Sequence, residues 1–345
     1  MRHTGIIGEA GALAATAYGD LISLTDKSQS GFTSTLDDRK LGLKLDTTWS
    51  QEEGLWDLRV GGMSEWNDLD HTLTGSHYRI RNGLSSQYDR RFGALTGTIG
   101  FRGDVTSDFG FNPGFSGGIG WGLSGKSLIK ARAGYTVNVP TFEQLYQTSH
   151  GSIDQSRGNP DLKEEKIWSY DLGIEHNFGK DRLLQFTLFR ADTRDLITSE
   201  RGTDKIYRPV NLAGAERQGI EITGKYGWET GLTAEMSVTL QSSKNKDTGK
   251  ELPYTPAIKL KSTVKYVLPR LKTRLEGTVR YEGSRFFSQV ENLPSQRLDE
   301  YVVVGIKAIQ PFSIGGNAAD CYVKADNLFN TPFQSHFGYP DDGIR

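Results

Sequence analysis

The chain has 345 residues, with 41 lysines and arginines against 42 aspartates and glutamates, and a formal net charge of −1. This balance gives no reason to expect a nucleic-acid partner. No run of about 18 apolar residues is present, which excludes a membrane-spanning helix, although membrane β-strands would show only as alternation. The single Cys321 excludes an intrachain disulfide and a cysteine zinc site. We expect no resident metal and no cofactor.

The first 20 residues, which are rich in alanine and glycine, are the first predicted strand. A secretory signal is the alternative, but Glu9 interrupts the apolar region that such a signal requires. We therefore expect the start of the protein to lie upstream of Met1.

Apolar and polar residues then alternate along most of the chain, as expected for strands with one apolar and one polar face. The segments 95–102, 115–123 and 170–178 follow this period of two. The clearest cases are 258–268 and 271–281, where apolar residues alternate with charged residues and threonine. We count roughly fifteen such strands and no comparable amphipathic helix.

Alternation fits both a soluble β-sandwich and a membrane barrel, and the connecting segments help to discriminate between them. Short and long connectors take turns, as in an outer-membrane barrel with short periplasmic turns and long outer loops. A Greek-key sandwich has no reason to show this order. The short connectors are predicted at 50–54, 88–92, 124–127, 178–182, 228–231 and 268–271, and the long ones at 19–39, 66–77, 104–113, 139–166, 199–213, 242–256 and 284–296.

Aromatic residues gather near the predicted strand ends, where the girdles of a membrane barrel lie. Taken singly, each is equally compatible with ordinary packing, and only their recurrence is informative. The sequence therefore predicts an all-β fold, an antiparallel transmembrane β-barrel. The aromatic residues in question are Trp49, Trp56, Trp66, Trp168, Tyr170, Tyr226, Trp228, Tyr281, Phe286 and Phe287.

Two glycine-rich motifs resemble enzyme signatures but do not predict catalysis. Residues 114–118 fit G-x-S-x-G, and residues 120–125 fit G-x-G-x-x-G. Each signature requires a strand, a turn and then a helix, whereas another strand is expected here. The glycines instead let a sheet bend or approach packed material closely. We therefore expect no catalytic residues and no enzyme activity.

Polar loop residues are the candidates for ligand contacts. His71 and His77 share a predicted loop with two aspartates and could bind a cation or another ligand. A solvated polar loop explains them as well. On polarity alone, and with the same alternative, the segment 139–165 contributes Tyr146, His150, Asp154 and Arg157.

An ordered series of motifs resembles the barrel of TonB-dependent outer-membrane receptors. The most specific are VPTFEQLY at 139–146 and GNPDLKEE at 158–165, although residue 164 is Glu where that family usually has Pro. The resemblance is strong from about residue 88 onward and thin before it. It implies structural roles, in turns and loop anchors, for Pro140, Gly158, Asn159, Pro160, Leu162, Glu165, Asn211, Gly219, Glu221, Asn327, Leu328, Phe329, Gly338, Tyr339, Gly343 and Arg345.

The resemblance also implies an architecture and an assembly. Members are barrels of about 22 strands whose lumen is plugged by an N-terminal domain that contacts TonB. Residues 1–345 would then be one partial barrel domain of about fifteen strands, without the plug and the final strand, and not autonomous in function.

The implied function is uptake of a metal chelate, such as a ferric siderophore or cobalamin, across a Gram-negative outer membrane. The implied partners are the inner-membrane TonB complex, acting through the plug region, the small chelate and outer-membrane lipid. Two alternatives stay open: a passive porin-like or structural barrel, and a soluble secreted β-sandwich that binds a ligand.

Overall fold

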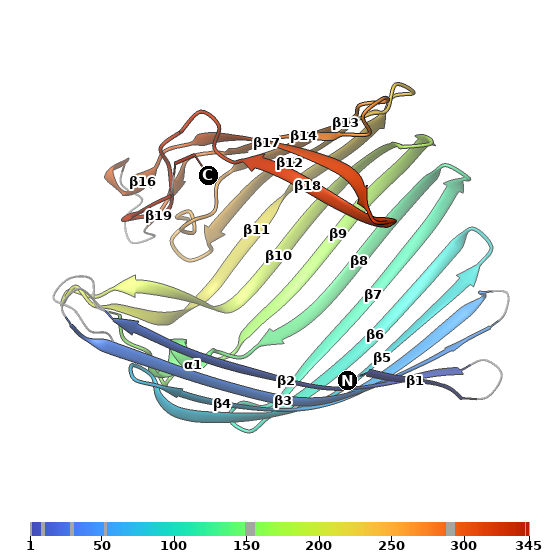
Figure 1. Ribbon diagram of the computed structural model, residues 1–345. Coiled ribbons are helices and arrows are strands. Elements are labelled where there is room, and N and C mark those ends of the chain that lie inside the picture. The colour runs from blue at the N-terminus through green and yellow to red at the C-terminus, as the bar shows by residue number, and fades with distance from the viewer. Residues whose placement is uncertain are drawn as a thin grey trace. The chain divides into compact units, whose positions relative to one another are not determined.

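The computed structural model describes residues 2–7, 11–27, 31–51, 54–148, 156–287, 294–341 and 343–344, with side chains from residue 11 onward (Figure 1). Sixteen strands form one sheet in the order β1 to β14, then β17 and β18, so that sheet order follows chain order. Two further sheets have two strands each, β15–β16 and β19–β20. The described part of the chain contains no helix long and apolar enough to cross a membrane.

The strands of the first half are long, and the predicted count of roughly fifteen is close to the sixteen of the sheet. They are β1 (Arg2–Ile7), β2 (Gly11–Lys27), β3 (Thr33–Ser50), β4 (Trp56–His71), β5 (Gly75–Phe92), β6 (Leu95–Thr106), β7 (Gly110–Ser124), β8 (Ser127–Asn138), β9 (Glu165–Gly179) and β10 (Arg182–Arg201).

The rest of the chain adds the 21-residue β11, the remaining strands of the large sheet and the two small sheets. These are β11 (Tyr207–Gly227), β12 (Leu232–Asn245), β13 (Ile258–Val267), β14 (Arg274–Glu282), β15 (Arg285–Phe286), β16 (Arg297–Leu298), β17 (Tyr301–Ile314), β18 (Asn317–Ala325), β19 (Gln334–His336) and β20 (Tyr339–Pro340). The helices are α1 (Phe142–Tyr146) and the 3-10 turn η1 (Pro294–Gln296).

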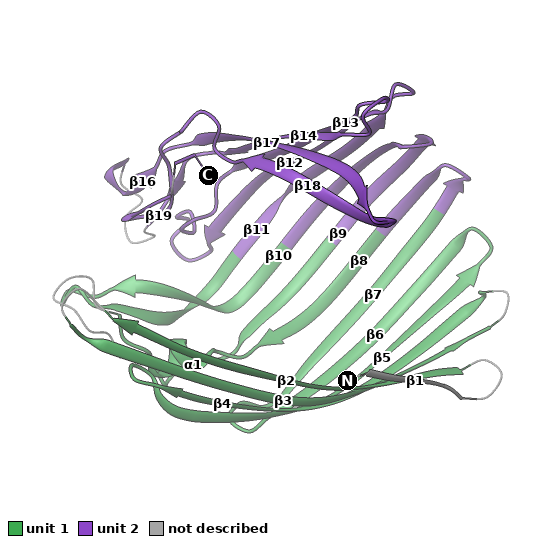
Figure 2. Ribbon diagram, viewed as in Figure 1, with its two compact units in different colours: residues 1–121, 131–170, 191–215 green, residues 122–130, 171–190, 216–345 purple. Residues whose placement is uncertain are grey.

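The chain separates into two compact units, each with its own buried residues (Figure 2). The first comprises residues 1–121, 131–170 and 191–215, and the second residues 122–130, 171–190 and 216–345. The buried apolar side chains come from α1, the loop after it and β11 in the first unit, and from β16 and the start of β17 in the second. They are Phe142, Leu145, Leu162, Leu212 and Ala215 in the first unit, and Leu298 and Tyr301 in the second.

The predicted alternation places apolar and polar residues on opposite faces of the strands. In the second unit, Lys261 lies opposite Arg280 on one face, while Leu260 lies opposite Tyr281 on the other. In the first unit the apolar face is exposed: Ile99 is 66% and Ile119 60% exposed. A β-sandwich would bury this face against a second sheet, whereas a membrane barrel presents it to lipid.

Four of the predicted long connectors, at 19–39, 66–77, 104–113 and 199–213, are wrong. The strands run on through them, and β4 and β5, for example, are joined only by residues 72–74. Pairing continues with polar residues, as where Asp37 lies opposite Asp70, and the Thr35 and Thr72 hydroxyls lie 3.0 Å apart. Charged, hydroxyl and turn-forming residues interrupt the apolar period by which a strand is recognised in these extensions, although apolar pairs such as Val105 opposite Phe111 are present.

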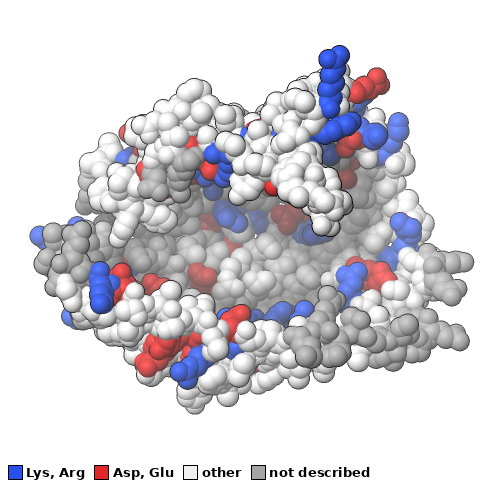
Figure 3. All heavy atoms as spheres, in the orientation of Figure 1, with Lys and Arg blue, Asp and Glu red and all other residues white. Residues whose placement is uncertain are grey.

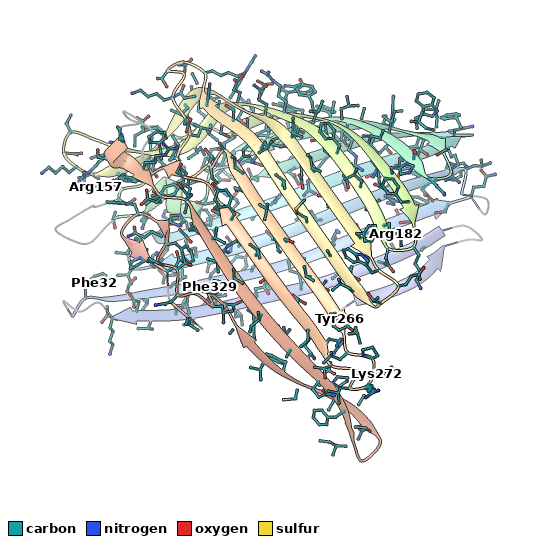
Figure 4. The ribbon with its side chains drawn as sticks, turned by 90° about the horizontal axis from the view of Figure 1, so that it is seen from above. Phe32, Arg157, Arg182, Tyr266, Lys272 and Phe329 are labelled. Carbon is teal, nitrogen blue, oxygen red and sulfur yellow. The ribbon has the colours of Figure 1, made fainter. Side chains whose placement is uncertain are left out.

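The predicted connectors at 139–166, 242–256 and 284–296 do contain long non-strand segments. In the second unit, Figure 4 shows Tyr266 and Lys272 beside the β13–β14 turn, with Phe329 at the opposite end of the strands. The loop that follows β8 is the largest of these segments in the first unit, and it holds most of the predicted ligand contacts.

Candidate ligand-binding site

The loop between β8 and β9 is built around the five-residue helix α1, which begins in a capping box. The Gln144 backbone N–H donates to the Thr141 hydroxyl at 3.2 Å, and the Thr141 N–H donates to the Gln144 side-chain oxygen at 2.9 Å. Phe142 and Leu145 of this helix are buried. The cap and the two apolar contacts together hold a helix that is too short to be stable alone.

The second half of the loop closes onto α1 through Gly158 and Asn159. Their N–H groups donate to Gln147 O at 2.7 Å and to Gln144 O at 2.8 Å. A Cβ on Gly158 would lie 2.5 Å from the Leu145 carbonyl carbon, so only glycine fits this approach. The Asn159 side chain donates to Pro209 O at 3.1 Å, which joins the loop to β11.

Asn211 and Glu165 hold a distorted residue of β10 in place. The Asn211 side chain accepts from Lys163 N–H at 2.8 Å and donates to Asp195 O at 2.7 Å. The Glu165 carboxylate accepts from Ile197 N–H at 2.8 Å. Asp195, the residue of β10 that these contacts hold, has φ 55°, a left-handed conformation that is uncommon outside glycine. These contacts give the implied structural roles of Asn211 and Glu165 a physical basis.

Several other motif positions lie at turns or make hydrogen bonds within the fold. Asn327 is buried with φ 50° and exchanges two hydrogen bonds with the Thr331 backbone. Gly338, with φ 82°, stands between β19 and β20, immediately before Tyr339. Leu328 N–H donates to Val304 O at 2.8 Å, and the Glu221 carboxylate accepts from the Ser237 hydroxyl at 3.5 Å.

Six further motif residues differ in how much the structure shows of them. Leu162 is buried and Phe329 is 70% exposed. A Cβ on Gly219 would clash with Leu240 O. Pro160 and Gly343 lie in non-strand segments. Arg345 lies outside the described residues.

Three of the six predicted ligand residues are brought together at the start of this loop. The rings of Tyr146 and His77 stack with centroids 3.8 Å apart, and His77 also contacts Thr74 O at 2.8 Å. His71 hydrogen-bonds the Thr74 hydroxyl at 2.9 Å and the Ser34 hydroxyl at 3.2 Å. Both His71 ring nitrogens therefore have protein partners, as does one nitrogen of His77.

Of the other three predicted residues, only Arg157 is among the described residues. Arg157 is exposed, and its N–H donates to Tyr207 O at 2.8 Å. His150 and Asp154 lie outside the described residues. Within the described residues no group of three or more His, Cys, Asp or Glu side chains is placed to hold a metal ion.

Arg79 is a central residue of the cluster that sequence reasoning missed. Its guanidinium pairs with Asp108 at 2.8 Å, donates to Pro140 O at 2.9 Å and lies 4.8 Å from the Phe142 ring. It thereby ties the β6–β7 turn to the loop that carries Tyr146. Arg79 lies just outside the predicted loop 66–77 and carried no signal of this role, because its partners are distant in sequence.

A cavity of about 630 Å³ opens on the polar face of the first unit. Five charged residues from neighbouring strands line it: Asp46, Arg59, Arg81, Arg102 and Asp104. Asp104 is only 7% exposed and accepts from Arg102 at 2.6 Å and from Arg81 at 3.0 Å. On the face that Figure 3 shows, charges of both signs are dispersed and form no single-sign patch.

Sequence reasoning missed this cavity because it depends on register. Ser85 lies opposite Arg102 and Gly83 opposite Asp104, and only this pairing brings Arg81 within reach of the same carboxylate. The alternation placed Arg102 on the polar face of its strand, whereas Asp104 fell in the predicted connector 104–113, so the alternation was a signal for only one of these charges. Chemically, the cavity offers hydrogen-bond donors and acceptors.

The two motifs that resemble enzyme signatures lie where the sequence predicted. Residues 114–118 fall inside β7, and residues 120–125 run from β7 into the tight turn that leads to β8. A strand follows the turn, so neither motif has the strand–turn–helix context that its chemistry requires.

Comparisons with known proteins point to one family. The profile described as TonB dependent receptor-like, beta-barrel matches residues 8–328. The Vitamin B12 transporter BtuB of Photobacterium profundum is 25% identical over 312 residues, which are 84% of this chain and 48% of that protein. The chain thus spans about half the length of the curated relatives that it matches.

Solved structures agree with this chain in fold. A variant of the ferric enterobactin receptor PfeA from Pseudomonas aeruginosa matches with a TM-score of 0.78 at 20% identity, over 99% of this chain and 59% of that one. The copper transporter OprC matches with a TM-score of 0.80 at 15% identity, over 99% of this chain and 62% of that one. At these identities the likeness establishes the barrel fold alone.

Proposed function

Because this chain belongs to the family of TonB-dependent receptors with a β-barrel, we propose that it serves in the uptake of a metal chelate across the outer membrane. The family is one of receptors and transporters, and we assign the chain no enzyme activity. The observation that carries the proposal is the family match over residues 8–328.

The anchored loop of the first unit supports a binding role. Its backbone is held by Gly158, Asn159 and Asn211 through contacts to α1, β10 and β11. A loop fixed in this way presents side chains in a set geometry, which lowers the entropic cost of binding. The stacked pair of Tyr146 and His77 is the part of this loop that we propose to contact ligand, together with Arg157, His71, His150 and Asp154.

We infer a ferric siderophore or cobalamin as the ligand class, because relatives and structural neighbours include a vitamin B12 transporter and a ferric enterobactin receptor. Energy for transport would come from the inner-membrane TonB complex, which would act on a plug region. Residues 1–345 would form part of the barrel domain around that plug. The polar-face cavity beside Arg81 and Asp104 is a second surface that a polar chelate or a plug segment would meet.

The test is accumulation of labelled ferric enterobactin and labelled cyanocobalamin in cells that lack their own receptors, with and without TonB. Residues 1–345 are compared with a chimera that adds the N-terminal region and the final strand of a close relative. We expect TonB-dependent accumulation of one probe by the chimera and none by residues 1–345 alone.

Two results would contradict this. TonB-independent leakage of many small solutes through the chimera would favour the passive barrel. TonB-dependent uptake by residues 1–345 alone would show that the added regions are dispensable.

A further inference from the structure

A groove of about 600 Å³ lies on the apolar face of the first unit, away from the candidate ligand site. Gly97 and Gly117 form part of its floor, and Tyr88, Ile99 and Ile119 stand along it. A Cβ on Gly97 would meet nothing within 4 Å, and one on Gly117 would meet only Thr98 O at 4.0 Å. The fold therefore does not itself require glycine there, and the space is open to another molecule.

Arg90 stands at one end of this groove, directly opposite Gly97. Its guanidinium contacts the Tyr88 hydroxyl at 3.3 Å and lies 5.1 Å from the Phe92 ring. Among the described residues no carboxylate forms an ion pair with it. A cation on an apolar, lipid-facing surface is costly unless an anion compensates it.

The surroundings of Arg90 place it at headgroup depth. Trp56 lies opposite Arg90 on β4, and Phe92 lies opposite Leu95 at the tight turn between β5 and β6. The Trp56 and Tyr88 rings are 6.4 Å apart. Tryptophan and tyrosine at strand ends mark the membrane interface, where lipid phosphates are found.

We propose that the groove holds an acyl chain of an anionic membrane glycerophospholipid whose phosphate pairs with Arg90. The apolar walls accept the chain and the open glycine floor gives it room. Arg90, one of the two arginines that line the groove, supplies the positive charge that pairs with the phosphate. The site rests on the proposed membrane location, and it is separate from ligand uptake.

The test uses the protein in the complete form that its gene encodes, in nanodiscs containing phosphatidylglycerol or phosphatidylcholine, with retained lipid counted by native mass spectrometry. Wild type should retain phosphatidylglycerol in preference to phosphatidylcholine. Gly97→Leu and Gly117→Leu should each reduce retention of both lipids about tenfold, since they fill the groove. Arg90→Gln should remove the preference for phosphatidylglycerol.

The matched control is Gly62→Leu. A Cβ on Gly62 also meets nothing within 4 Å, and Gly62 does not line the groove, so this variant should retain lipid as wild type does. Equal lipid retention by wild type and both groove variants would overturn the proposal. A similar loss of lipid in Gly62→Leu would also overturn it.

Co-purification of lipopolysaccharide instead of phospholipid at this site would also overturn it. Flotation with membranes on a density gradient tests the premise separately: a protein that fails to float contradicts the membrane location, whereas a floating protein with unchanged lipid retention contradicts only the groove.

Discussion

Gly158 lies so close to Leu145 that a methyl group on it would sit 2.5 Å from the Leu145 carbonyl carbon. The contact closes the loop onto α1 and sets the position of Tyr146, whose backbone nitrogen is equally near. The loop that carries the candidate ligand contacts thus depends on the absence of one side chain.

We expect Gly158→Ala to destabilise this loop by about 1–3 kcal/mol, as overpacking does elsewhere. Hydrogen exchange of the backbone amides in residues 139–165 measures the change. The control is Gly125→Ala in the β7–β8 turn, where a Cβ meets nothing within 4 Å. Unchanged protection in Gly158→Ala would show that α1 moves aside without cost.

Asn211→Ala removes the contacts that join Lys163 to Asp195, and we expect it to cost about 1–3 kcal/mol. Exchange at Ile197 and Lys163 should rise, because the left-handed Asp195 loses its support. Asn177→Ala is the control, since the Asn177 side-chain oxygen accepts only within its own turn, from Gly179 N–H at 2.9 Å. Similar effects of the two variants would mean that Asn211 has no special anchoring role.

The assignment of faces predicts unequal effects on β13. Val264→Arg should lower the free energy of unfolding of the complete barrel by about 2–4 kcal/mol, because it places a charge in lipid near mid-strand. Lys261→Ala, on the polar face, should cost far less. A denaturant titration in lipid vesicles measures both, and equal or reversed effects would mean that the faces are assigned wrongly.

Tyr146→Phe separates ligand contact from packing. The ring stack on His77 is kept, whereas the hydroxyl, which has no hydrogen-bond partner among the described residues, is lost. We expect unchanged stability and roughly two- to tenfold weaker binding of whichever probe, ferric enterobactin or cyanocobalamin, the receptor takes up. Equilibrium binding measures this, and unaltered affinity for that probe would remove the hydroxyl from the proposed site.

The Asp204 carboxyl in the β10–β11 turn should become protonated only in strong acid. A hydrogen bond from Arg208 lowers the pKa of Asp204 to about 2. Because the pKa falls on folding, the stabilising contact is complete above the ordinary carboxyl range and is lost as pH drops toward 2. A local probe in the turn should show no change between pH 5 and 8, and Arg208→Gln should move the transition upward. A transition that stays in place in Arg208→Gln would contradict this pairing.

The sequence by itself determined the strands and their faces wherever one face is apolar. Alternation over 258–281 is a local property of the chain, so β13 and β14 could be predicted without knowing their partners. The turn chemistry of Asn327 was equally local, whereas the close approach of Gly158 to Leu145 exists only in the folded loop.

Only the tertiary structure decided which polar residues meet. The stack of Tyr146 on His77, the contact of Arg79 with Pro140 O and the pairing of Arg81 with Asp104 all join separate strands or loops. The polar extensions of β2 to β5 likewise became visible only through their partners. The physical reason is that register is set by pairing across the sheet, and a polar residue in one strand carries no mark of the residue that it will face.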